Sequence, residues 1–424
     1  MGSKQMYREP QLFRTTLSCG LRVVLEQTDG NVAYCGYAID AGTRDEDEAH
    51  PGMAHFIEHM LFKGTSKRKA WHILNRMENV GGELNAYTNK EETVVYSVFL
   101  VECMQRAVEL LTDLVFHSTF PQHEIQKEIE VIIDEINSYE DSPAGLIFDE
   151  FENMIFDGHA LGHNILGEPD RLRTYTTSDA LNFTHHFYRP DNAVFFVRGN
   201  ITFKQLVRML EKCLEMPVSY PSLPEAPLYL PRVAPAPYVA SRQIRTRDTH
   251  QVHAMVGSRA YPMQHPQRLG LFLLNNVIGG PGMNSLLNVS LREHHGLVYT
   301  VESNLTGYTD TGIFNIYFGC DAIDVERCIE LTCKELLSLC TKAMSTARLH
   351  AAKKQLIGQI GVATDNHENN ILGLGKAYLH YNRCEAIPEI CRRIEALTSS
   401  QLLDIANEIF HPDLLSVLIY TGNQ

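Results

Sequence analysis

The sequence predicts an α+β fold in which two homologous domains follow one another, each with a mostly antiparallel sheet packed against helices. Two observations predict this fold. Segments of the first half of the 424-residue chain recur in the second half, and a proline-rich stretch lies between the halves. We therefore expect an N-terminal domain at 1–215, a linker at 216–239 and a C-terminal domain at 240–424.

The repeat is clearest at the end of each half. Residues 177–200 and 398–423 each contain a polar cap, a helical stretch, a Pro-Asp turn, an apolar strand and a Gly-Asn pair. A second match, of 120–136 with 344–360, has an offset of 224 residues, close to the 221 to 223 of the first match. Two matches at nearly one offset favour an internal duplication over chance similarity.

The linker contains seven of the 18 prolines, which favour an extended chain and exclude a continuous helix. They are Pro217, Pro221, Pro224, Pro227, Pro231, Pro235 and Pro237. On either side of the linker, residues 92–100 and 312–319 have the alternating pattern of strands, and long amphipathic helices accompany them.

Composition restricts the function classes. The formal net charge of -14 and the pI near 5.7 argue against a nucleic-acid-binding protein, which usually carries a basic patch. The chain has no apolar run of membrane-spanning length and no signal-peptide pattern, and its ten cysteines form no CxxC pair. These features predict a soluble cytoplasmic protein with reduced thiols.

Residues 53–65, "MAHFIEHMLFKGT", combine an apolar stripe with three ionisable side chains. The apolar positions follow i, i+3, i+4, i+7 and i+8, which is one face of a helix: Met53, Phe56, Ile57, Met60 and Leu61. At 100° per residue, His55, Glu58 and His59 fall on the opposite side. The three ionisable groups are therefore expected to lie together and away from the packed stripe.

Two histidines at i and i+4 can converge on one metal ion, and this geometry fits His55 and His59. Glu58, on the same face, can reach a water bound to that metal and act as a general base. The order H-x-x-E-H is the inverzincin signature. The alternative is a surface helix that happens to carry two histidines.

A second helix, predicted at 123–140, offers carboxylates. Its core stripe consists of five isoleucines, Ile125, Ile129, Ile132, Ile133 and Ile136. Glu128 and Glu135 are two turns apart on one line at the edge of this stripe, where they can bind an ion or hold an imidazole. A solvated acidic face is the alternative. The acidic run "RDEDEA" at 44–49 is more typical of a solvated loop than of a cation site.

The spacing of these motifs resembles that of the pitrilysin-type (inverzincin) zinc metallopeptidases, the family of the mitochondrial processing peptidase β subunit and insulin-degrading enzyme. In that family H-x-x-E-H is followed after about 76 residues by a glutamate, with another glutamate seven residues before it. Here His59 and Glu135 are 76 residues apart. Residues 81–98, "GGELNAYTNKEETVVYSV", also resemble the segment that follows the family's metal-binding helix.

The resemblance implies a role for each matching residue. His55, His59 and Glu135 correspond to the zinc ligands, and Glu58 to the catalytic base that activates a zinc-bound water. Glu128 corresponds to the carboxylate behind the ligands. The resemblance thus implies one Zn²⁺ cofactor, although ligands of this type also accept manganese or cobalt.

The second half resembles the family at another place. The segment "LREHHGLVYTV" at 291–301 is similar to the one whose Arg and Tyr face the zinc from the opposing half of the enzyme, here Arg292 and Tyr299. The segment "GGPGMNSLLN" at 279–288 is similar to the family's glycine-rich loop but departs from a plain glycine run, so a structural turn is an equal alternative.

The second half should lack a metal site of its own. At the 224-residue offset, the positions of His55, His59 and Glu135 fall on Gly279, Met283 and Gln359, of which none supplies an imidazole or a carboxylate. We therefore expect one zinc ion per chain.

The resemblance implies an endopeptidase that hydrolyses peptides or unfolded polypeptides in a chamber between two chains. It also implies that substrate binds along "ELNAYT" at 83–88, where Asn85, Ala86 and Tyr87 are the candidate contacts. A homodimer is favoured because one chain carries both the zinc motif and the Arg-Tyr pair. Two alternatives stay open: a catalytic subunit that needs a homologous partner, and a non-proteolytic structural subunit.

Overall fold

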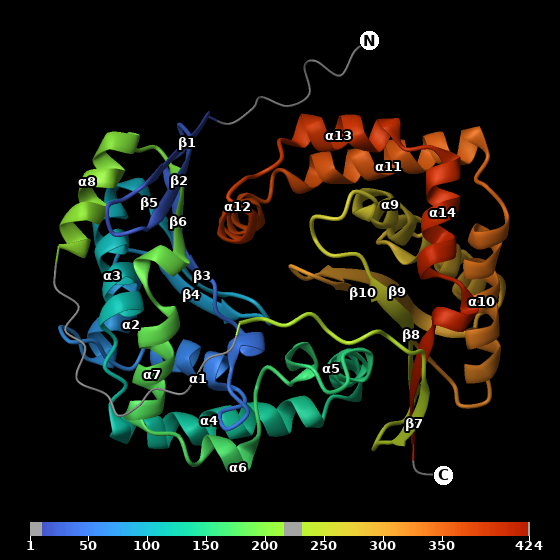
Figure 1. Cartoon of the computed structure of the whole chain (residues 1–424), viewed down its shortest axis with the longest axis horizontal. Coiled ribbons are helices and arrows are strands. Elements are labelled where there is room, and N and C mark those ends of the chain that lie inside the picture. Colours follow the sequence, from blue (N-terminus) through green and yellow to red (C-terminus); the bar gives the residue numbers. More distant parts are fainter. Residues whose placement is uncertain (1–10, 216–230, 423–424) are drawn as a thin grey trace. The chain divides into compact units, whose positions relative to one another are not determined.

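The structure, a computed structural model, describes residues 11–215 and 231–422. They form two compact units (Figure 1). Within the described residues, one unit contains 11–136, 163–215, 231–232 and 366–385, and the other contains 137–162, 233–365 and 386–422. Much of the predicted linker lies at 216–230, outside the described residues, as do positions 1–10 and 423–424.

The first unit contains a six-stranded sheet in the order β1-β2-β6-β3-β5-β4. The strands are β1 Gln11–Thr16, β2 Arg22–Gln27, β3 Val32–Ile39, β4 Glu83–Thr88, β5 Thr93–Leu100 and β6 Ala193–Gly199. All neighbours are antiparallel except β2 and β6, which are parallel. Because β4 pairs only with β5, it is an edge strand.

The second unit contains a five-stranded sheet in the order β7-β11-β8-β10-β9. Its strands are β7 Arg242–Thr246, β8 Val252–Ala260, β9 Val298–Gly307, β10 Gly312–Cys320 and β11 Ser416–Thr421. Here β7 and β11 form the parallel pair, and the other neighbours are antiparallel. This sheet repeats the order of the first one without β1, so the predicted α+β duplication is confirmed.

Helices pack on both sheets. In the first unit they are α1 Met53–Met60, α2 Ala70–Glu78, α3 Met104–His117, α4 Gln122–Glu140 (which continues into the second unit), α6 Pro169–Leu172, α7 Thr177–Phe187, α8 Phe203–Leu214 and α12 His367–Tyr381. In the second unit they are α5 Pro143–Ile155, α9 Arg268–Gly279, the π-helix Asn288–His294, α10 Val325–Thr341, α11 Thr346–Ala363, α13 Ile387–Ala396 and α14 Ser399–Ile409.

The repeated segments fold into the same elements. Residues 177–200 form α7 and β6, and 398–423 form α14 and β11 up to the last described residue. Both helices begin with a capping box, in which the side chain of Thr176 or Thr398 accepts a hydrogen bond from the backbone N–H three residues later. The two repeated segments therefore also begin their helices, α7 and α14, with the same type of N-terminal cap.

Each unit includes one helix from the other half of the chain. Helix α12 packs on β6 and β3 of the first sheet, and α5 packs on β8 and β11 of the second (Figure 1). Gly375 allows the close approach of α12, because a Cβ there would lie 2.4 Å from the Phe196 ring. Arg22 donates hydrogen bonds of 2.9 Å to the C-terminal carbonyls of Tyr378 and Leu379 in α12. The compact units are thus not continuous stretches of sequence.

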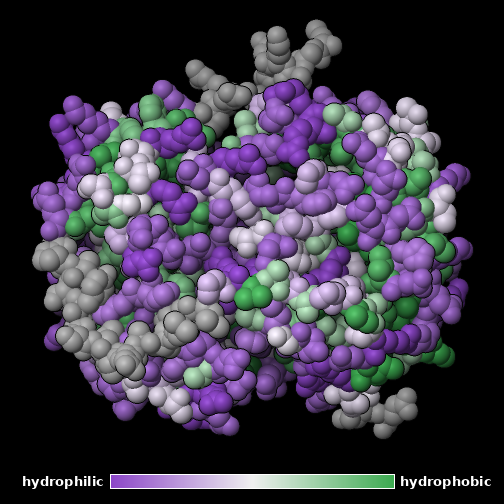
Figure 2. Space-filling model, viewed as in Figure 1, coloured by the Kyte–Doolittle hydropathy of each residue, from purple (hydrophilic) through white to green (hydrophobic). Residues whose placement is uncertain are grey.

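No helix in the described ranges combines the length and the apolar character needed to cross a membrane. The face shown in Figure 2 is largely hydrophilic, with small hydrophobic areas between polar ones.

A buried ionic cluster joins α12 to the first sheet. Glu92, 1% exposed, lies 2.6 Å from Nζ of Lys376 and 3.1 Å from Nε2 of His380. The side-chain amide of Asn89 donates a third hydrogen bond to the Glu92 carboxylate, at 2.8 Å. Burial raises the pKa of Glu92, but the contacts with His380 and Lys376 outweigh it and lower the pKa to about 2.

The Glu92 cluster predicts an acid-sensitive contribution to stability. Because the folded-state pKa lies below the ordinary 4.5, ionised Glu92 stabilises the fold above pH 4.5, and this stabilisation is lost as the pH falls toward 2. We expect Glu92→Gln to reduce the free energy of unfolding at pH 7 by about 3 kcal/mol. By pH 4 the deficit should shrink by roughly 1 kcal/mol.

Urea unfolding of both proteins at pH 7 and pH 4 measures this difference. The matched control is Glu211→Gln, at an exposed position of α8, which should leave the midpoint within error at both pH values. A Glu92→Gln deficit that stays constant with pH would contradict the assignment.

Candidate metal centre

Helix α1 is fixed at its start by a close approach of two backbone segments. Gly52, the residue before the helix, has φ +88, and a Cβ there would lie 2.6 Å from the Cα of Gly167. Gly167 is equally confined, at 2.3 Å from the carbonyl oxygen of Pro51. The hydroxyl of Tyr175 donates a 2.7 Å hydrogen bond to that same carbonyl. Only glycine satisfies both the left-handed conformation and the lack of space.

Glu46 caps the first turn of α1. Its carboxylate accepts hydrogen bonds from the backbone N–H of Gly52 at 2.7 Å and of Ala54 at 2.8 Å. These N–H groups have no partner inside the helix, and a negative charge at a helix N-terminus is favourable. Burial raises the pKa of Glu46 well above its usual value, and these two hydrogen bonds oppose the shift. Glu46 therefore positions the helix that carries the candidate ligands.

The predicted packing stripe of α1 is confirmed: Met53, Phe56, Ile57, Met60 and Leu61 are all at most 2% exposed. The opposite side of the helix is less open than expected. His55 is only 7% exposed, whereas Glu58 and His59 are partly exposed. The ionisable side faces other protein elements because α1 also packs on β4.

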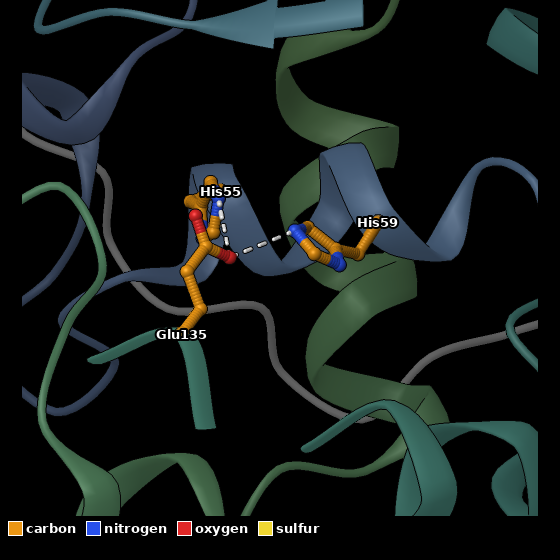
Figure 3. Close-up of side chains that lie close together, drawn as sticks. All are labelled: His55, His59 and Glu135. Atoms are coloured by element: carbon orange, nitrogen blue, oxygen red, sulfur yellow. Dashed lines mark ion pairs between the residues drawn. The ribbon is translucent and has the colours of Figure 1, made fainter. Parts of the chain in front are cut away.

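The structure brings the three candidate ligands together from α1 and α4 (Figure 3). Oε2 of Glu135 lies 3.8 Å from Nε2 of His55 and 3.5 Å from Nε2 of His59. Each residue offers a ligand atom within 4.8 Å of the others. Ligand atoms about 2.0–2.1 Å from a tetrahedral zinc ion lie roughly 3.3 Å apart, so this donor set fits zinc after small side-chain movements. It is the one such three-residue group found in 11–215 and 231–422.

Glu128 orients His59 from behind. Its Oε1 lies 2.9 Å from Nδ1 of His59, and its Oε2 lies 2.5 Å from Nζ of Lys63. Because an ionised carboxylate only accepts hydrogen bonds, His59 donates from Nδ1, which in the neutral imidazole leaves the Nε2 lone pair directed at Glu135. Glu128 is itself 7% exposed. This is the geometry expected of a carboxylate that orients a metal-binding histidine.

Burial and nearby charges shift the pKa values of His55 and His59 in opposite directions. Burial, with a smaller contribution from His59, lowers the pKa of His55 to about 3, so His55 is neutral with a free lone pair. For His59, burial lowers the pKa, but the hydrogen bond to Glu128 and the charges of Glu128 and Glu135 outweigh it and raise the pKa. The carboxylates thus give the pair a strong attraction for positive charge.

Glu58 is on α1 with the two histidines, and Thr88 of β4, His59 and Glu135 all influence its charge. Burial raises its pKa, opposed by hydrogen bonds from Thr88 of β4 and by the nearby His59, while Glu135 adds to the rise. A raised pKa makes a carboxylate a stronger base near neutral pH. The role of Glu58 as a base stays a prediction.

The predicted substrate strand is β4. Asn85, Ala86 and Tyr87 lie in this edge strand, each partly exposed. An edge strand has backbone N–H and C=O groups available to an added strand, and β4 packs against α1, which carries the candidate ligands. Their contact with a substrate stays a prediction.

Arg292 and Tyr299 belong to the second unit. Both line a cavity of about 690 Å³ in that unit, and Tyr299 is 82% exposed on β9. The same cavity is lined by Gly279, Met283 and Gln359, the counterparts of the metal-site positions. In the second unit, the positions that correspond to the candidate ligands therefore line a cavity and carry no metal-binding side chain. The role of Arg292 and Tyr299 near a zinc ion stays a prediction.

The expectation of a solvated loop at 44–49 is wrong for its first half. Arg44, 5% exposed, pairs with the buried Glu91 at 2.6 Å, and Asp45 accepts hydrogen bonds from Arg232. Together with Glu46, these residues build the support of α1. The sequence contained one signal of the capping role, which was the glutamate six residues before Gly52. Because this glutamate lies in a run of charged residues, the whole run was interpreted as a solvated loop.

Family comparisons agree with this geometry. Residues 22–169 match the family described as "Insulinase (Peptidase family M16)", and residues 174–356 match "Peptidase M16 inactive domain". The first match contains all five residues of the candidate centre, and the second contains Gly279 and Met283, in line with a second half that lacks ligands.

Relatives match along nearly the whole chain. An uncharacterized zinc protease, YmxG, of Bacillus subtilis is 31% identical over 96% of this chain and 97% of its own length. The mitochondrial-processing peptidase subunit beta of Rattus norvegicus is 31% identical over 95% of this chain and 83% of its own. A protease structure from Helicobacter pylori has the same fold, with TM-score 0.89 at 22% identity, covering 97% and 100% of the two chains. The chain therefore belongs to peptidase family M16, the pitrilysin-type family.

Proposed function

We propose that this chain is a zinc-dependent endopeptidase whose metal is held by His55, His59 and Glu135. The observation that carries the proposal is the convergence of these three donors, with Glu128 hydrogen-bonded to His59. Zinc proteases among the relatives support a metallopeptidase. A structural subunit would have no need for the complete donor set.

A zinc ion at this site would supply Lewis acidity, polarising the scissile carbonyl and acidifying a water molecule. Glu58 accepts the proton of the attacking water and returns it to the leaving nitrogen. Glu128 holds His59 in the tautomer that leaves Nε2 unprotonated. Glu46 keeps the first turn of α1 in place, so the two histidines keep their spacing.

Substrate would add to the edge of the first sheet in extended form. Strand β4 offers its free edge beside α1, and backbone pairing gives affinity with little demand on side-chain sequence. Such binding requires an extended segment, which favours peptides and unfolded polypeptides. Arg292 and Tyr299 would hold the substrate backbone and stabilise the oxyanion through charged and hydroxyl donors.

We further propose that two copies of the chain enclose a chamber, with Arg292 and Tyr299 of one copy serving the zinc of the other. The presence of both groups of residues in one chain supports a homodimer. The similarity to a processing peptidase beta subunit favours a second candidate, a catalytic subunit that needs a homologous partner.

The role of Glu58 as base predicts that Glu58→Gln reduces turnover of a quenched fluorescent peptide by about 10²- to 10⁴-fold. Zinc content should be unchanged, because Glu58 is not among the three converging donors. The control is Asp134→Asn, an exposed residue beside Glu135 on α4, which should keep wild-type turnover. Near wild-type activity of Glu58→Gln would remove Glu58 as the base.

The ligand assignment predicts graded effects on metal affinity. Glu135→Gln should purify with far less zinc than one ion per chain, since it loses a charged donor. Glu128→Gln should weaken zinc binding by about 10- to 100-fold, because it only orients His59. Competition with a chromophoric chelator and elemental analysis measure both, with Asp134→Asn as control. Full zinc binding by Glu135→Gln would contradict the proposed donor set.

The homodimer predicts that the purified chain elutes at about 96 kDa, twice its 48.0 kDa, and cleaves peptide without another protein. Mixing Glu58→Gln chains with Arg292→Ala chains should restore part of the activity that each lacks alone, since a mixed dimer contains one complete site. An active monomer, or no rescue on mixing, would rule out the shared site; a zinc-loaded but inactive chain would favour the partner-dependent alternative.

A further inference from the structure

The first unit also contains a large cavity, of about 1050 Å³, which is separate from the cavity of the second unit. It is lined mainly by residues of α2, α3 and α8. It shares no residue with the candidate metal centre. Its lining is rich in charge, with five Lys or Arg residues against three Asp or Glu residues. This excess of positive charge is unusual on a chain with net charge -14.

Two of the three carboxylates are already neutralised. Asp113, 2% exposed, accepts hydrogen bonds from Thr65 and Arg68. Glu109 binds Arg68 at 2.7 Å and Arg76 at 2.9 Å. Arg68 is not part of the lining, so it neutralises Glu109 and Asp113 of α3 without using a cation of the lining. The lining therefore has more unpaired cations than unpaired carboxylates among the described residues.

The remaining cations of the lining have no counter-ion within 11–215 and 231–422. Lys67, Arg106, Arg208 and Lys212 make no ion pair with any described residue. Arg106 donates one hydrogen bond to the carbonyl of Arg76, at 3.0 Å. On α8, Arg208 and Lys212 are at i and i+4, so they lie on one helix face and reach the cavity together. Glu102 is the one carboxylate of the lining left to oppose these four charges.

A buried histidine completes the lining. The His117 side chain is 9% exposed, and its Nδ1 lies 3.5 Å from Oδ1 of Asp113, the outer limit of a hydrogen bond. Its Nε2 is buried and has no hydrogen-bond partner among the described residues. A buried polar atom without a partner costs free energy, and because Nε2 has almost no accessible surface, we do not count it among the groups that contact a ligand.

We propose that this cavity binds a small polyanion that carries a chain of phosphate groups. Arginine forks and lysines are the usual partners of phosphate oxygens, and Arg106, Arg208, Lys67 and Lys212 offer such donors along the lining. No Phe, Tyr or Trp occurs among the described lining residues, so the lining has no stacking platform for a nucleobase. The phosphate chain itself is therefore the recognised group. This site goes beyond the proposed peptidase activity and does not depend on it.

Titration calorimetry of the full chain with inorganic tripolyphosphate tests the site. We expect one binding event per chain. Arg208→Ala/Lys212→Ala should weaken it at least tenfold, with an unchanged circular dichroism spectrum because both side chains are exposed. The matched control, Arg14→Ala/Lys204→Ala, removes the same charge from exposed positions of β1 and α8 outside the lining and should bind as wild type.

Four results would overturn the proposal. They are no binding by the wild-type chain, equal weakening in both double variants, an unchanged affinity in the cavity variant, and ATP binding more than tenfold tighter than tripolyphosphate. The second would show a non-specific charge effect, and the third would place the ligand elsewhere, for example on a metal at His55 and His59. The fourth would mean that a base, rather than the phosphate chain, determines recognition.

Discussion

The contact between α1 and α4 is the constraint on which the candidate centre depends. Two ligand histidines come from one helix and the carboxylates from another, so the site exists only where the two helices hold their register. The stripe of α1 is packed, Gly52 and Gly167 allow no shift of its start, and the hydrogen bond from His59 to Glu128 fixes the rotation of α1 against α4. A metal ion would then bind a geometry that is already formed.

Helical phase in the sequence was sufficient to predict which residues of α1 pack and which face the site, because that phase is a local property. The isoleucine stripe of α4 was predicted in the same way. Three features were not predictable from local pattern: the burial of His55, the capping role of Glu46 and the exchange of α5 and α12. The burial of His55 and the exchange of α5 and α12 depend on neighbours distant in sequence. Glu46 caps a helix that starts only a few residues later, but its charge suggested contact with solvent.

The duplicated fold separates what stabilises the chain from what performs chemistry. Both sheets have the same strand order and the same parallel pair, yet the second unit carries glycine, methionine and glutamine at the ligand positions. The fold therefore needs no metal. The first unit keeps His55, Glu58, His59, Glu128 and Glu135 together although like charges repel, and such an arrangement is expected where function requires it.

The local charge at two places in the first unit extends this argument. The candidate metal centre concentrates carboxylates around imidazoles and attracts a cation. In the cavity beside α3 and α8, Arg68 and Arg76 neutralise Glu109 and Asp113, and other cations make no ion pair with a described residue. Opposite local charges within one unit do not follow from the net charge of -14 of the whole chain. They follow from the side chains that each helix directs toward its neighbouring elements. The ligands of the two sites should therefore carry charges of opposite sign and bind independently.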